Sequence, residues 1–179
     1  MQKENLDFII AEAGSGYTYI GAYYEMIKSN EQVFNLQLRY WIEAKNRFEG
    51  LNGNFVLEEA LLIIKLLCGS LEALAGVNIN PPKNDYTPPL DKLFEETLKN
   101  NKGWDICSEK PELFTKLVSM DKYNKNLCKH LHKGRKDLLK EINYEKLNEY
   151  MKTTQEIWLW VLDKKYHGNI PEDQLQFLK

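Results

Sequence analysis

The sequence has few of the features that mark a secreted or membrane-spanning protein. Its three cysteines, Cys68, Cys107 and Cys128, are far apart and form no C-x-x-C pair, which argues against a disulfide scaffold or a zinc site and favours a reducing compartment. The longest apolar run, from Ala60 to Cys68, is interrupted by Lys65 and is too short to cross a bilayer. The first residues show no signal-peptide pattern. We therefore expect a cytoplasmic protein with no membrane partner.

A strong excess of charge of either sign is also absent. The 24 basic and 26 acidic residues give a net charge of −2, which argues against a dominant electrostatic attraction to nucleic acid. Arginine is scarce, with only Arg39, Arg47 and Arg135. Strand-like alternation is confined to short stretches, and no repeat with a period of about 20–50 residues occurs, so a solenoid is not expected. At 179 residues and 43% apolar composition, the chain is long enough for one domain with a proper core.

Apolar residues recur at helical spacing along most of the chain. We expect Asn54 to cap the start of the third predicted helix and Gly76 to cap its end. A proline-rich connection at about 77–89 interrupts the pattern and is either a functional loop or a crossover. The pattern predicts a single all-α domain over residues 1–179, an antiparallel helical bundle of five or more helices. The predicted helices are Leu6–Ser29, Glu31–Phe48, Phe55–Ala75, Leu90–Lys99, Pro111–Leu131, Tyr144–Tyr166 and a short terminal helix opened by Pro171.

The segment from Tyr123 to Arg135 holds two of the three histidines and the densest basic cluster. On a helix with about 100° per residue, Lys125, Lys129 and His132 share a solvated side, and His130 lies at its rim. The opposite, buried side is predicted to hold Leu113, Leu117, Leu127 and Leu131.

This segment resembles the motif of the HEPN family, the higher eukaryotes and prokaryotes nucleotide-binding domains. In that family an Arg is followed by a polar residue, commonly Asn, and a His comes after four to six intervening residues. Here Lys125 stands in place of the Arg, Asn126 follows it, and either His130 or His132 completes the pattern. We favour His132, because seven residues make almost two helical turns and bring it to nearly the same face as Lys125.

The resemblance implies metal-independent RNA cleavage in a homodimer, with no cofactor. It assigns proton transfer at the ribose 2′-hydroxyl or the leaving oxygen to His132 or His130. It assigns the hold on the scissile phosphate to the residue at Lys125, and the orientation of the histidine or phosphate to Asn126. The binding residues expected around them are all basic: Lys129, Lys133 and Arg135.

The resemblance covers roughly residues 112–166 and, more loosely, 31–75. It departs from the family at Lys125, because a lysine supplies charge without the planar fork of an arginine. We therefore expect a HEPN-like helical module of a defence or toxin–antitoxin type system that binds RNA or a partner, with catalysis weakened or lost. Two alternatives stay open: an active metal-independent HEPN endoribonuclease, and a non-enzymatic interaction or inhibitor module with no nucleic-acid role.

Simpler interpretations apply to the same residues. Two histidines among lysines at a helix end are also typical of a solvated face that suits the helix dipole. His130 and His132 are two residues apart and have no third ligand nearby, so no metal site is expected. Trp158 and Trp160 cannot both face the same way, so we expect one of them at the seam of a homodimer or of a complex with a partner protein.

Overall fold

The computed structural model describes the backbone of residues 30–76, 88–130 and 136–178, and the side chains of residues 38–75, 88–126 and 139–178. All regular structure in these ranges is helical, which confirms the predicted all-α class. The helix predicted over Leu6–Ser29 lies outside the described residues. The elements are α3 (Asn30–Gly50), α4 (Leu57–Gly76), α5 (Leu90–Phe94), η2 (Glu95–Lys99), α6 (Asn100–Lys102), α7 (Ile106–Glu109), α8 (Pro111–His130), η4 (Lys136–Glu141), α9 (Tyr144–Tyr166) and α10 (Glu172–Gln176).

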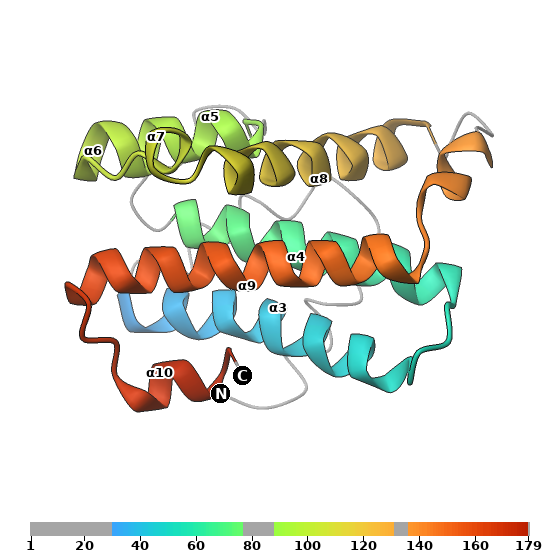
Figure 1. Ribbon diagram of the computed structural model, residues 1–179, viewed down its shortest axis with the longest axis horizontal. Coiled ribbons are helices and arrows are strands. Elements are labelled where there is room, and N and C mark those ends of the chain that lie inside the picture. The colour runs from blue at the N-terminus through green and yellow to red at the C-terminus, as the bar shows by residue number, and fades with distance from the viewer. Residues whose placement is uncertain (1–29, 77–87, 131–135, 179) are drawn as a thin grey trace.

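Two antiparallel helical hairpins form the bundle, as Figure 1 shows. The first pairs α3 with α4, and the second pairs α8 with α9. The helices α5, η2, α6 and α7 intervene between the hairpins. As a result α4 and α9, which pack against each other, run in the same direction.

The core is centred on α4. Ile63, Ile64, Leu67 and Leu71 recur at helical spacing on this helix and are all fully buried. Full burial of each such side chain contributes about 1.5–3 kcal/mol, so α4 is the main apolar support of its neighbours. Within the described part of the chain, no helix is long and apolar enough to cross a membrane.

The start of α4 differs from the prediction, which placed the N-cap at Asn54. The N–H of Asn54 is donated to the carbonyl of Leu51 at 2.7 Å, so Asn54 belongs to the turn before the helix. The N–H of Ala60 is donated to the carbonyl of Val56 at 2.9 Å. The backbone therefore becomes helical at Leu57, two residues later than predicted.

The helix predicted over Leu90–Lys99 continues to Lys102 and contains one π-helical turn, η2. Gly103 ends it with a φ of 72°, a left-handed conformation that glycine adopts without steric cost. The short helix α7, which follows, was not predicted.

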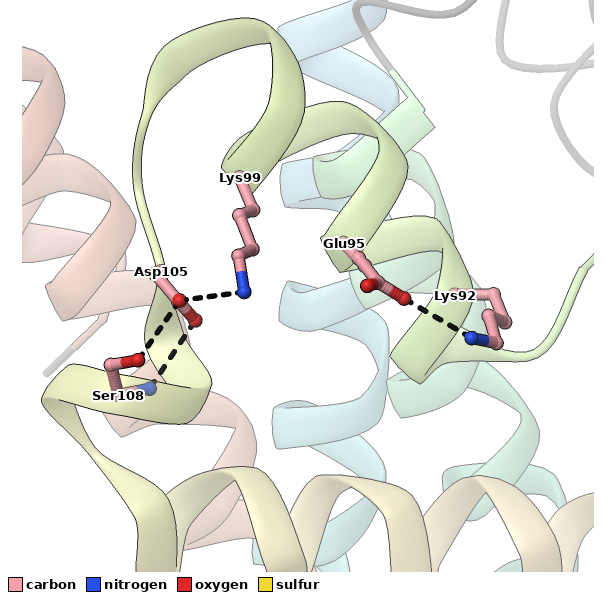
Figure 2. A network of polar contacts seen from close by, with 5 residues as sticks. All are labelled: Lys92, Glu95, Lys99, Asp105 and Ser108. Carbon is pink, nitrogen blue, oxygen red and sulfur yellow. Dashed lines mark hydrogen bonds and ion pairs between the residues drawn. The ribbon is translucent and has the colours of Figure 1, made fainter.

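Asp105 fixes the corner that leads into α7 and α8 (Figure 2). Its carboxylate accepts the N–H of Ser108 at 3.2 Å and the hydroxyl of Ser108 at 2.9 Å, which caps the start of α7. Lys99 of η2 pairs with the same carboxylate at 2.9 Å. A second ion pair, Lys92–Glu95, lies on the same helical segment, but it is exposed and adds little stability.

The prediction that Trp158 or Trp160 lies at an intermolecular seam is wrong, because one chain buries both side chains. Trp158 is fully buried and donates its indole N–H to Ser70 Oγ of α4 at 2.8 Å. Trp160 is 7% exposed and donates to Glu109 Oε2 of α7 at 3.1 Å. The two indoles do diverge as predicted, but Ser70 of α4 contacts one of them and Glu109 of α7 contacts the other.

Candidate functional site

Helix α8 carries a carboxylate on its buried side. Leu113 and Leu117 line that side as predicted, with 7% and 0% of their surface exposed. Asp121 follows Leu117 by about one turn and is only 4% exposed. Removing a charge from water costs several kcal/mol unless partners compensate. The stability of this part of the bundle therefore depends on the partners of Asp121.

One oxygen of Asp121 connects two helices. Asp121 Oδ2 accepts a hydrogen bond from Lys125 Nζ at 2.8 Å, one turn further along α8. The same oxygen accepts the backbone N–H of Leu90, the first residue of α5, at 3.1 Å. Pro89 precedes α5 and has no side chain that can cap a helix. Asp121 therefore supplies from α8 the acceptor that the start of α5 needs.

The other oxygen of Asp121 has no donor within the described residues. Asp121 Oδ1 is buried and has no hydrogen-bond partner among the described residues. A buried acceptor left without a donor costs about 1–3 kcal/mol.

Glu72 of α4 is the second acidic group of this region. Burial raises the pKa of Glu72 to about 7, the nearby Asp121 carboxylate raises it as well, and Lys125 acts in the opposite direction. Tyr40 of α3 faces the same group: burial raises the pKa of its hydroxyl, and the charge of Glu72 adds to that effect. We call Tyr40, Glu72, Asp121 and Lys125 the carboxylate junction.

The carboxylate junction is suited to holding or releasing a proton near neutral pH. With Lys125 and Asp121 ionised, its net charge is zero when Glu72 is protonated and −1 when Glu72 is ionised. Neither state attracts a phosphate group. In the described part of the chain, no group of three or more His, Cys, Asp or Glu side chains is arranged to hold a metal ion.

The structure describes only part of the predicted HEPN-like motif. Lys125 and Asn126 are both half-buried on α8. The prediction that Lys125 lies on the solvated side is wrong in part: its side chain is 39% exposed, and its ammonium turns back to the buried Asp121. The backbone of Lys129 and His130 belongs to α8, but their side chains lie outside the described residues.

The remaining predicted residues, His132, Lys133 and Arg135, also lie outside the described residues. The alignment of Lys125 with His132 on one face therefore stays a prediction. The same holds for the preference for His132 over His130.

The HEPN-like motif does not include Glu72 and Asp121, because basic residues, an asparagine and a histidine define it. A usable signal was present in the sequence: Asp121 comes four residues after Leu117, on a helix face predicted to be apolar. Glu72 likewise follows Leu71 within the most apolar helix of the chain. Acidic residues at such positions are rarely buried unless they are paired, so they indicate a buried electrostatic contact.

No family model, no curated protein and no solved structure significantly matches this chain.

Proposed function

We propose that this protein is a HEPN-like helical module of a defence or toxin–antitoxin type system, and that it binds RNA through the outer face of α8 without cleaving it. The observation that carries the proposal is the contact of 2.8 Å between Lys125 Nζ and Asp121 Oδ2. The residue that stands where the HEPN motif has its phosphate-holding arginine is thus already paired with a buried carboxylate.

This ion pair weakens any hold on a scissile phosphate. A phosphate clamp works by supplying uncompensated positive charge where negative charge develops. The charge of Lys125 is offset by Asp121 and, above about pH 7, is exceeded once Glu72 ionises as well. A lysine also lacks the two parallel N–H donors with which arginine grips a phosphate. The expected result is binding without catalysis.

The outer face of α8 supports a binding role. Lys116 and Lys122 are exposed there, with Ser119 between them. Neither lysine forms an ion pair with a described residue. Glu112, in the first turn, is the one acidic residue on the exposed surface of the described part of α8. Unpaired lysines on one helix face suit contacts with a phosphate backbone.

Cleavage is tested by incubating RNA with the full chain in EDTA. We expect no cleavage by wild type, by His132→Ala or by His130→Ala, and at most a weak gain in Lys125→Arg. Metal-independent cleavage by wild type that His132→Ala abolishes would overturn the proposal and establish the endoribonuclease alternative. Cleavage that survives both histidine substitutions would also overturn it, and would place the chemistry elsewhere in the chain.

Binding is tested by measuring the affinity for single-stranded RNA against salt concentration. The double variant Lys116→Gln/Lys122→Gln removes two outer-face charges, so the slope of log K against log salt should fall by roughly 1.4. The matched control, Lys65→Gln/Lys152→Gln, removes two exposed lysines from α4 and α9 and should leave the slope unchanged. Equal effects of the two double variants, or no binding by wild type, would contradict the proposal. Absence of binding would favour the protein-interaction alternative.

Assembly is a separate part of the proposal. The HEPN resemblance implies a homodimer whose two motifs meet across the interface. Light scattering of the full chain at high concentration measures this directly. A strictly monomeric chain would count against the dimer and leave a partner protein as the remaining form of assembly.

A further inference from the structure

We propose that Trp41 of α3 and Gln155 of α9 form a peptide-binding site, which this chain fills with its own residues 171–178 and which accepts the same segment from a second copy of the chain. We call residues 171–178 the strap. The proposal does not depend on the proposed RNA-binding function, because none of these residues belongs to α8.

The strap is anchored through its backbone and one side chain. Trp41 donates its indole N–H to the carbonyl oxygen of Phe177 at 2.8 Å. The side-chain amide of Gln155 donates to the carbonyl oxygen of Leu178. The Leu178 side chain is 2% exposed and belongs to the hydrophobic core. Two donors to consecutive carbonyls bind a peptide backbone, and the buried position of Leu178 selects an apolar side chain, as in other peptide-binding sites.

Both donors belong to the bundle and not to the strap. Trp41 lies on α3, is 2% exposed and packs within the core. Gln155 is half-buried in the middle of α9. An indole N–H at such a position usually has a hydrogen-bond partner, and leaving it unpaired is costly. When the strap leaves, the site therefore keeps the groups that bind a second peptide of the same kind.

The strap is weakly held before it reaches its anchors. No residue of α10 is buried. Gln174 Oε1 is shielded from solvent and has no hydrogen-bond donor among the described residues, which opposes closure. The chain turns back after α9 at Gly168, whose φ is 82°, and the connection adds the partly buried Ile170 (Figure 1). A few contacts at its far end therefore determine whether the strap stays closed.

A second copy of the chain is the occupant that these contacts fit, because it carries the same carbonyl groups and the same leucine. Within one chain a short connection presents the strap to its site at an effective concentration of roughly millimolar. Exchange of straps between two copies keeps every contact of the closed form. It therefore competes with closure within one chain as the protein concentration approaches that range.

Hydrogen exchange of the Trp41 indole N–H, followed by NMR of the full chain, tests the anchor. Leu178→Asp places a charge at the buried position, so protection of this N–H should fall by roughly tenfold or more, while the Trp158 indole keeps its protection. The matched control is Phe177→Asp, which adds the same charge to a side chain that is 41% exposed, and it should behave as wild type. Equal loss in the two variants, or no loss in Leu178→Asp, would overturn the strap. Leu178→Ala should give a smaller loss in the same direction, and it replaces Leu178→Asp if that variant folds poorly.

A synthetic peptide of residues 170–179 tests the site directly. Added to full-length Leu178→Asp, it should return the Trp41 indole signal to its wild-type position. Its affinity for wild type should be roughly tenfold lower or less, because the strap must open first. The same peptide with Leu178→Asp should bind neither chain. Equal affinity for both chains, no binding, or binding that leaves the Trp41 signal unchanged would overturn the site.

Exchange between copies is tested by mixing full-length wild-type chains labelled at their leucine methyl groups with wild-type chains labelled at their tryptophan indoles. A nuclear Overhauser effect between the Leu178 methyls of one copy and the Trp41 indole of another should appear at roughly millimolar protein and grow with concentration. The same mixture of Leu178→Asp chains should give no intermolecular signal at the Trp41 indole. Contacts confined to one copy at every concentration would overturn the second copy as the occupant.

Discussion

Helix α4 makes two polar contacts through residues only two positions apart, Ser70 and Glu72, and the two contacts differ in kind. Ser70 accepts the indole N–H of Trp158 at 2.8 Å, in a neutral contact that is fully buried. Glu72 faces Asp121 and Lys125 in a charged cluster, where Asp121 Oδ1 is left unpaired within the described part of the chain. Two residues on a helix are about 200° apart, so the first contact faces α9 and the second faces α8.

The neutral contact stabilises the fold, whereas the charged contact makes the stability of the fold depend on pH. A satisfied neutral hydrogen bond contributes about 0.5–1.5 kcal/mol and does not change with pH. The charged cluster carries the cost of desolvating its carboxyls, and protonation of Glu72 alters that cost. On this basis we expect the α4–α9 contact to set stability and the α4–α8 contact to set its pH dependence.

The largest expected effect on stability comes from the neutral contact between Trp158 of α9 and Ser70 of α4. Trp158→Ala removes a fully buried indole and leaves Ser70 without its donor, so we expect a loss of about 3–5 kcal/mol in the free energy of unfolding. Urea denaturation followed by circular dichroism measures this loss. Trp104→Ala is the control, because that indole is only half-buried, and it should cost clearly less. Equal losses would show that α9 is not the main support of α4.

The second effect is the pH dependence of stability that Glu72 causes in the carboxylate junction. Because the folded-state pKa of Glu72 is raised from 4.5 to about 7, the unfolded chain releases its proton first as the pH rises. The stability penalty is therefore absent below about pH 4.5, grows up to about pH 7 and is complete above it, with a size on the order of 2–3 kcal/mol. Denaturation of wild type and Glu72→Gln at pH 5 and pH 8 measures this penalty, because only wild type should lose stability between the two pH values through Glu72.

Ser70→Ala serves as the pH-independent comparison for the same measurement. This substitution removes the hydrogen bond on the neutral side, so it should lower stability by a similar amount at both pH values. A difference between pH 5 and pH 8 that disappears in Ser70→Ala and persists in Glu72→Gln would reverse the roles assigned to the two contacts.

The third effect concerns the cation of the junction. Lys125→Met keeps most of the side-chain length but leaves Asp121 with no ammonium partner, so we expect a loss of about 1–3 kcal/mol at pH 7. Lys122→Met, on the exposed face of the same helix, is the control and should change stability by less than about 0.5 kcal/mol. Thermal unfolding at one protein concentration compares the two. Similar small effects would mean that water already compensates Asp121.

The helices were predictable from the sequence, and the polar contacts between them were not. The boundaries of α9 match the predicted 144–166, because its apolar residues recur at helical spacing and Gly168 follows its end. Lys125 was placed on the solvated side because a helical wheel gives the direction of the Cβ atom alone. A lysine is long enough to reach back one turn to Asp121, and that choice depends on what α4 and α5 place beside it.

The two tryptophans illustrate the same limit on α9. Trp158 and Trp160 diverge as the spacing predicts, but the inference of an exposed seam assumed that only one side of α9 is covered. The contact to Trp160 comes from Glu109 of α7, a short helix that sequence periodicity did not predict, and α8 also packs against α9. The number of neighbours around a helix is a tertiary property, which its own residues do not encode.

The smallest expected effect separates two asparagines that look alike in the sequence. Asn143 precedes α9, and its side chain accepts the N–H of Lys146 at 2.8 Å, so Asn143→Ala should cost about 1 kcal/mol by removing a true N-cap. Asn54 precedes α4, but it lies in the turn before the first helical residue, so Asn54→Ala should change stability by less than about 0.5 kcal/mol. Paired denaturation curves of the two variants at pH 5, where Glu72 carries its proton, keep the charged junction out of the comparison. If Asn54→Ala costs as much as Asn143→Ala, α4 begins at Phe55 in solution, and the loop before α4 is part of its first turn.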